Sequence, residues 1–258
     1  MKTLKSNGKK VFVLIALMVL VIGAAIGYLV VDELRQEDIL KQEIINISNK
    51  DLVTGDFEVK VKTTGDYAYI EEAIKNYYKN LSDNIKVLNS YLTDENLIKI
   101  LSADNISSDG PSFVNSYKLL EDTKVNSAKA MEEIASLCKE ETIKNLLDNK
   151  KVDDYSYELY LDLMYSKEDL ADMKMISDDM QKLSNDLNIF LDKVIGILKF
   201  LEGNANMWSI EDGQLYFKST ALVNEYNSLY NDLTEFSKNN FSNIDNKYSR
   251  KSMTNSNV

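Results

Sequence analysis

The longest uninterrupted apolar stretch lies near the N-terminus of the chain. Residues 11–31 contain no charged side chain. At about 1.5 Å per helical residue, this stretch of 21 residues would extend roughly 30 Å, the thickness of the hydrocarbon core of a bilayer. A soluble helix of this length would normally carry a polar face, and residues 11–31 carry none. The pattern therefore predicts a single transmembrane helix.

The charges that flank this stretch predict its orientation. Residues 1–10 carry four lysines and no acid, whereas residues 32–38 carry four acids and one arginine. Basic flanks stay on the cytoplasmic side of a membrane. We therefore expect a cytoplasmic N-terminus, a signal anchor that contacts the lipid bilayer through residues 11–31, and an extracytoplasmic C-terminal part.

A cleaved signal peptide is the alternative interpretation of the same stretch. Gly23-Ala24-Ala25 offers the small residues that a signal peptidase prefers, and cleavage would follow Ala25. The apolar run is, however, longer than the roughly 7–15 residues of a typical signal-peptide core, which favours an uncleaved anchor. Both interpretations place the C-terminal part outside the cytoplasm.

Beyond residue 31, apolar residues recur mainly at intervals of three and four, the spacing of one helix face. A polar loop interrupts this periodicity at Asn105–Gly110, and Pro111 is expected in the first turn of the helix that follows. The periodicity predicts a helical stalk at 32–50, a long helix at 66–92, a short piece around 94–102, a helix from about 111 to 138, two short helices between 141 and 165 with a break near 149–151, and a last helix capped by Ser219.

The clearest pattern is a heptad seam, in which apolar residues alternate steps of three and four over four repeats. Ser166 and Asp169 precede the seam with the spacing of a capping box, and Gly203 follows it as a helix stop. The seam consists of Met173, Ile176, Met180, Leu183, Leu187, Phe190, Val194, Ile197 and Leu201.

Two segments change to a period of two, which is typical of half-buried strands. Residues 56–62 alternate apolar and charged side chains. Residues 207–218 surround Asp212-Gly213, a preferred type I′ turn, and folding the chain there places Trp208 opposite Phe217 on an apolar face. Because a lone hairpin is only marginally stable, we expect the strand at 56–62 to pair with it.

Together these elements predict a mostly α fold, in which a transmembrane helix precedes an extracytoplasmic antiparallel helical bundle with a β-hairpin or three-stranded sheet at one end. The predicted organisation is a cytoplasmic tail at 1–10, the transmembrane helix at 11–31, the stalk at 32–55, the bundle at 56–239 and a disordered tail at 240–258.

Composition narrows the classes of partner and of compartment. Removing the four tail lysines from the 30 basic residues leaves 26 against 41 acidic residues, a net charge of −15 beyond the apolar stretch. This charge disfavours nucleic acid as a partner. Lysine greatly outnumbers arginine and one cysteine excludes an intrachain disulfide, which suits the envelope of a bacterium with a single membrane.

The inventory of reactive side chains argues against catalysis. Histidine is absent, which removes the commonest general base and the usual zinc ligands. Cys138 lies on an apolar helical stripe and is interpreted as a core residue. Paired acids such as Glu71-Glu72 are interpreted as solvated helix faces. We therefore expect no enzyme activity, no cofactor and no metal site.

Four aromatic residues are the candidates for a partner-binding surface. Tyr155, Tyr157 and Tyr160 lie within one short helix that carries apolar residues on more than one side. Trp208 is the single tryptophan and lies in the predicted hairpin. Burial is the favoured interpretation of both features, with the hairpin closing one end of the bundle. Left outside, the same side chains would form a recognition surface.

Association between copies of the chain is a further expectation. The heptad seams most simply satisfy one another within one chain, which leaves the stalk as the part most free to form a homodimer. Gly23 and Gly27 also have the Gly-x-x-x-Gly spacing that permits close crossing of two membrane helices.

These features favour a membrane-anchored, non-catalytic interaction or scaffold module at the cell surface, which would bind an envelope protein or a cell-wall component. The alternative is an accessory subunit that binds a small ligand and works with a separate membrane protein. That alternative predicts a polar-lined cavity between helices.

Overall fold

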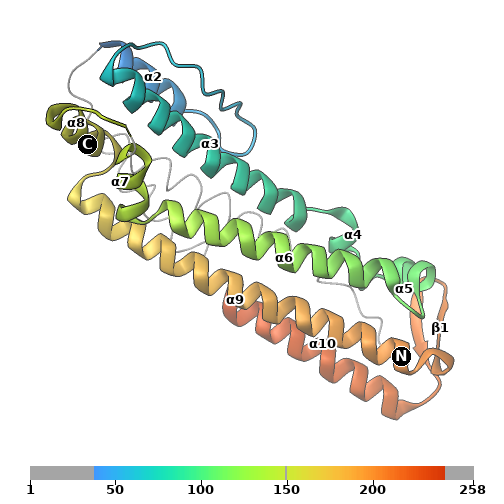
Figure 1. The fold of residues 1–258 in the computed structure, drawn as a ribbon. Helices are drawn as coiled ribbons and strands as arrows, with labels where there is room; N and C mark the ends of the chain where they lie inside the picture. Colours follow the sequence, from blue (N-terminus) through green and yellow to red (C-terminus); the bar gives the residue numbers. More distant parts are fainter. Residues whose placement is uncertain (1–37, 149, 242–258) are drawn as a thin grey trace, which may run out of the picture. The chain divides into compact units, whose positions relative to one another are not determined.

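The computed structural model describes residues 38–148 and 150–241 (Figure 1). The predicted tail at 1–10, the predicted transmembrane helix at 11–31, the start of the predicted stalk and residues 242–258 lie outside this range. In the part of the chain that is described, no helix is long and apolar enough to cross a membrane.

The chain is mostly helical with one small antiparallel sheet, as the periodicities predict. The helices are α2 (Asp38–Ser48), α3 (Asp66–Leu92), α4 (Glu95–Ile98), α5 (Ala103–Asp109), α6 (Val114–Leu137), α7 (Glu140–Asp148), α8 (Asp154–Met164), α9 (Lys167–Gly203) and α10 (Thr220–Phe241). A 3-10 turn, η1 (Ala205–Met207), leads into the strands β1 (Trp208–Glu211) and β2 (Gln214–Phe217).

The described residues form two compact units. The hairpin unit contains residues 90–128 and 184–241, and the strap unit contains residues 38–89, 129–148 and 150–183. We call the second one the strap unit after residues 55–64, an extended segment named the strap below. Helices α6 and α9 contribute residues to both units.

In the hairpin unit, the C-terminal half of α9 and the helix α10 lie side by side (Figure 1). Lys193 on α9 forms an ion pair with Asp232 on α10, and the rings of Phe190 and Phe241 meet edge to face at 5.9 Å. Phe241 is fully buried, so α10 extends past residue 239, where the disordered tail was predicted to begin.

The hairpin has the predicted register. Trp208 faces Phe217, and the turn residues Asp212 and Gly213 have φ angles of 50° and 70°, as a type I′ turn requires. The Trp208 ring stacks on Phe113 at 6.5 Å, and its Nε1 donates a hydrogen bond of 2.7 Å to the carbonyl of Leu201. The hairpin therefore packs against the end of α9.

The heptad seam of α9 is confirmed, because all nine of its residues are buried. The capping box before it is also present. Ser166 N donates to Asp169 Oδ2 at 2.7 Å, and Asp169 N donates to Ser166 Oγ at 3.2 Å. These reciprocal bonds satisfy two amides that the first turn of the helix would otherwise leave unpaired.

The loop predicted at Asn105–Gly110 is wrong, because these residues belong largely to α5. Ser102 caps this short helix by accepting a bond from Asn105 N, and Ile106 is buried. One buried apolar residue is too little to show a period in the sequence. The next helix, α6, begins at Val114, so Pro111 precedes the helix and does not lie in its first turn as predicted.

The strand predicted at 56–62 is also wrong. These residues are extended but belong to no sheet, and the sheet of the described chain contains β1 and β2 alone. The predicted three-stranded sheet is therefore replaced by a two-stranded one. Alternating side chains report an extended, half-buried backbone, and they do not report whether another strand lies beside it.

The described part of the predicted stalk is helical and packed. Leu40, Ile44 and Ile47 on α2 are each at most 3% exposed. Its apolar face is therefore covered within the strap unit, and α2 offers no free apolar stripe on that side for a second copy.

Candidate functional site

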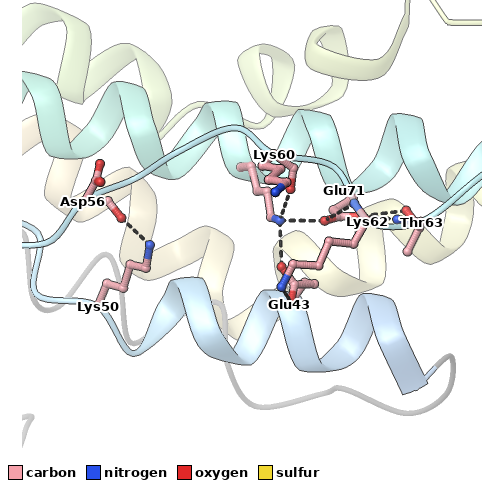
Figure 2. A network of polar contacts seen from close by, with 8 residues as sticks. Glu43, Lys50, Asp56, Lys60, Lys62, Thr63 and Glu71 are labelled. Atoms are coloured by element: carbon pink, nitrogen blue, oxygen red, sulfur yellow. Dashed lines mark hydrogen bonds and ion pairs between the residues drawn. The ribbon is translucent and has the colours of Figure 1, made fainter.

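The most distinctive polar feature of the molecule is the contact of the strap with α2 and α3 (Figure 2). The strap has exposed, charged side chains at positions 56, 58, 60 and 62, and apolar side chains at 57, 59 and 61, which are partly or fully buried. Phe57 is 4% exposed and stacks on Tyr78 of α3 at 6.5 Å. The sequence alternation thus sets which side of the strap faces the helices.

Lys75 of α3 connects all three segments. Its Nζ donates to Glu43 of α2 at 2.8 Å, to Glu71 of α3 at 2.6 Å and to the carbonyl of Lys60 in the strap at 2.7 Å. An ammonium group has three hydrogens, so these three bonds satisfy it completely. Burial acts to lower the pKa of Lys75, but the bonds to the two carboxylates outweigh it and raise the pKa.

Glu71 holds the C-terminal end of the strap. Its side chain is fully buried, and its carboxylate accepts bonds from the amides of Lys62 and Thr63 at 2.8–3.0 Å. The Thr63 hydroxyl adds a bond of 2.7 Å. Burial acts to raise the pKa of Glu71, but the bonds from Lys75, Thr63 and Lys62 leave it below its ordinary value.

Glu43 completes a set of two acids and two bases. Its second oxygen accepts a bond of 2.7 Å from the Nζ of Lys62, so Glu43 bridges two lysines. The hydrogen bonds from Lys62 and Lys75 lower the pKa of Glu43. Two carboxylates thus face two ammonium groups, and the formal charge of the cluster is zero, which offsets the cost of its burial.

Lysines also hold the N-terminal end of the strap. Lys86 on α3 donates to the carbonyl of Gly55 at 2.6 Å, and Lys50 donates to the carbonyl of Asp56. The ammonium groups lie over the Phe57 ring, that of Lys50 at 5.5 Å and that of Lys86 at 5.8 Å from its centre. Side chains therefore form hydrogen bonds with the strap backbone of the kind that a neighbouring strand forms in a sheet.

This arrangement is suited to holding a chain in place and poorly suited to catalysis. Its buried carboxylates and its buried ammonium group are all bonded to the protein itself, which leaves none of them turned toward a substrate. Within residues 38–148 and 150–241, no group of three or more histidine, cysteine, aspartate or glutamate side chains is placed to hold a metal ion.

Sequence reasoning missed this cluster. It interpreted Glu71-Glu72 as a solvated face, and for Glu71 that interpretation is wrong, because its side chain is 0% exposed. The available signal was that Glu71 and Lys75 have i, i+4 spacing and directly follow Ile70 and Ile74 of the apolar stripe. That spacing is common on exposed helices, so it does not by itself indicate burial.

The predicted partner-binding residues belong to both units and differ in their exposure. Tyr155, Tyr157 and Tyr160 all belong to α8, but Tyr155 is 60% exposed, Tyr157 is half-buried and Tyr160 is fully buried. The Tyr160 hydroxyl donates to the carbonyl of Ile143 at 2.7 Å. Trp208 lies in the other unit and is half-buried. Of the four, Tyr155 offers the most surface to a partner.

The remaining reactive groups lie in the core of the strap unit. Cys138 is 3% exposed, as predicted for a core residue, and burial raises the pKa of its thiol to about 12, so it is inert at neutral pH. The hydroxyls of Tyr77 and Tyr78 are buried and have no hydrogen-bond partner among the described residues. Burial raises the pKa of both tyrosines.

Comparison of the chain with protein-family models, with curated proteins and with solved structures finds no match.

Proposed function

We propose that this protein is a membrane-tethered, non-catalytic interaction module of the bacterial cell envelope. In this proposal residues 11–31 anchor the chain, the N-terminus is cytoplasmic, and the strap and hairpin units lie outside the cytoplasm. The apolar stretch and its asymmetric flanking charges support the anchor. The net charge of −15 beyond the anchor supports a role that does not involve nucleic acid.

The observation that carries the non-catalytic part is the closed cluster formed by Glu43, Glu71 and Lys75. Catalytic acids and bases must reach a substrate proton, whereas these groups are bonded to one another and to the strap backbone. The cluster stabilises a defined surface instead. A recognition surface needs such a rigid frame, because order that exists before binding lowers its entropic cost.

The location and orientation can be tested in intact cells. Protease added outside protoplasts should digest the chain beyond residue 31 and leave the membrane-embedded fragment with the N-terminal tail. Protection of the full chain in sealed protoplasts, with digestion only after lysis, would reverse the proposed orientation. Release of the full chain by a high-salt wash would refute the anchor.

The interaction surface can be tested by photocrosslinking in the same cells. A photoreactive amino acid at Tyr155 on α8 should give one discrete adduct with another envelope component. Val125 on α6 is a matched control, because it is 57% exposed against 60% for Tyr155. Equal adduct patterns from the two positions, or none from Tyr155, would reject this surface.

One observation favours the alternative, a small-ligand-binding accessory subunit. The Tyr77 hydroxyl is fully buried without a partner within the described residues, and buried polar groups nearly always have one. A small polar ligand could supply it. Native mass spectrometry of the full chain tests this alternative. A bound mass that is present in the wild type and absent in Y77F supports it. The absence of bound mass in both proteins rejects it.

A further inference from the structure

Side chains of the same chain form hydrogen bonds with backbone groups along one edge of the strap. In an extended chain, the N–H and C=O of one residue point to the same edge, and the next residue points to the other. Between residues 56 and 62, the strap groups that charged side chains bind belong to even positions: the carbonyls of Asp56 and Lys60 and the amide of Lys62. The bound groups of Gly55 and Thr63, at odd positions, lie at the two ends of the strap. Lys50, Lys75 and Glu71 therefore occupy the even edge.

The opposite edge belongs to Phe57, Val59 and Val61. Within the described chain, the amides and carbonyls of these three residues have no hydrogen-bond partner. Val59 and Val61 are partly exposed, so their unpaired backbone groups form the accessible part of this edge, whereas Phe57 is 4% exposed. Such an edge is a template on which another extended chain can pair.

The side chains of the strap indicate which chain would fit. Asp56 and Glu58, in its N-terminal half, are acidic, whereas Lys60 and Lys62, in its C-terminal half, are basic. All four are exposed. In an antiparallel copy the order of the charges is reversed, so acids lie opposite bases. The strap is therefore complementary to an antiparallel copy of itself.

We propose that two copies of this protein form a symmetric dimer by pairing their straps antiparallel, centred on Val59. Val59 then faces its counterpart, and Phe57 faces the second copy's Val61. In this register the odd residues occupy the hydrogen-bonded positions of the pair, with the partly exposed Val59 at its centre. Between them, Glu58 faces the second copy's Lys60, and Asp56 faces the second copy's Lys62.

Charge selects this register over its neighbours. Centring the pair on Phe57 would place Asp56 opposite Glu58, and centring it on Val61 would place Lys60 opposite Lys62. A parallel pair would place like charges beside one another along its whole length. Like charges directly opposite each other destabilise a sheet, and opposite charges stabilise it. The central pair of Glu58 and Lys60 contributes most, because Lys62 is already bonded to Glu43.

The same geometry limits the assembly to two copies. Both free edges are used in the pair, while the even edges remain occupied by Lys75, Glu71 and Lys50. An isologous contact of this kind closes on itself and leaves no open edge for a third copy. The strap is also held in place before pairing, which reduces the ordering cost. The pairing does not require the membrane anchor proposed above.

A charge-swap experiment on the full chain in detergent micelles tests the proposal. We expect the wild type to dimerise in sedimentation at matched solvent density. E58K and K60E should each weaken the dimer about tenfold or more, because each creates two like-charge pairs per dimer. The double variant E58K/K60E restores opposite charges and should dimerise like the wild type. All three variants change exposed side chains, so their helical content should not change.

A crosslinking experiment then tests the register. Facing residues in the positions of Glu58 and Lys60 would have Cα atoms about 4.5 Å apart, within the range of a disulfide. Mixing E58C with K60C chains should therefore give a disulfide dimer much faster than either variant alone. Cys138 is buried and serves as an internal control in the wild type, which should give none.

Three outcomes would overturn the proposal. The wild type could remain monomeric, which would leave the strap edge for a different protein. Dimers could persist equally in E58K and K60E, which would place the contact elsewhere, for example in the membrane helix. Finally, E58C could crosslink to itself as fast as to K60C, which would exclude the register centred on Val59.

Discussion

The strap and the hairpin have nearly the same sequence pattern and opposite structural solutions. Both alternate apolar and polar side chains, and both are extended. In the hairpin, residues 208–211 pair with residues 214–217 through backbone hydrogen bonds. In the strap, residues 55–64 have no neighbouring strand within the described chain, and lysine and glutamate side chains bond to the backbone instead.

The difference teaches that backbone groups can be satisfied in two ways with different consequences. A hairpin uses both partners' main chains, so its stability depends on the turn between them. The strap uses charged side chains of α2 and α3, so its stability depends on their protonation and leaves its second edge open. Only the strap is therefore both sensitive to pH and available to another chain.

The largest effect is expected from K75M, which removes the ammonium group that joins the strap to α2 and α3. Glu71, fully buried, would keep its charge without its main partner, and such uncompensated burial costs roughly 3–5 kcal/mol. Denaturant unfolding of the full chain should show this loss. K79M is the matched control, because the ion pair of Lys79 with Asp83 is exposed and its removal should cost less than about 1 kcal/mol.

Equal losses in K75M and K79M would contradict the role of the buried cluster. Loss of hydrogen-exchange protection in the hairpin amides of K75M, to the same extent as at Lys62 and Thr63, would contradict the assignment of the effect to the strap.

Acid should loosen the strap before the hairpin. The folded pKa values of Glu43 and Glu71 lie below the ordinary 4.5, so their stabilisation is complete above pH 4.5 and is lost as the pH falls through the lower folded values. The folded pKa of Lys75 lies above 10.5, so its contribution is complete below pH 10.5 and is lost at higher pH. The hydrogen-exchange protection of the Lys62 and Thr63 amides should follow the same dependence on pH.

Hairpin amides provide the internal comparison, since their partners are main-chain carbonyls that do not titrate. The variant E71Q should remove much of the acid-dependent step at Lys62 and Thr63. A parallel loss of protection in the strap and the hairpin at every acidic pH would show that the cluster does not govern the strap.

The smallest effect is expected at the hairpin turn. Gly213 has a φ of +70°, a region that costs residues with a Cβ roughly 1–2 kcal/mol, so G213A should lower the free energy of unfolding by about that amount. Gly196, in the interior of α9, has no positive φ and no atom within 4 Å of an added Cβ. The control G196A should therefore raise stability by roughly 0.5–1 kcal/mol. The same sign for both substitutions would refute the turn argument.

Much of the helical fold could be predicted because its signals are local. The seam of α9, the capping box at Ser166 and the register around Asp212-Gly213 each depend on residues that are close in sequence. The errors arose where local signals were weak or ambiguous. A single buried residue, Ile106, was too little to reveal α5, and the alternation at 56–62 could not distinguish a strand from a strap.

The candidate site was predicted poorly for the same reason. Glu71 and Lys75 resemble an ordinary exposed pair in sequence, and nothing near them identifies Glu43, which precedes Lys75 by 32 residues, as their partner. The exposure of Tyr155 and the burial of Tyr160 on one helix likewise depended on which side of α8 the rest of the unit covers.

The sequence by itself therefore determined where the long helices and the hairpin form, which side chains are apolar, and the charge pattern that makes the strap complementary to a reversed copy. The tertiary structure alone decided that α2 and α3 lie against the strap, that Glu71 is buried, and which backbone groups of the strap the charged side chains bind. The physical reason is that periodicity and turn chemistry act between neighbours in sequence, whereas the pairing of buried charges depends on which segments the fold brings together.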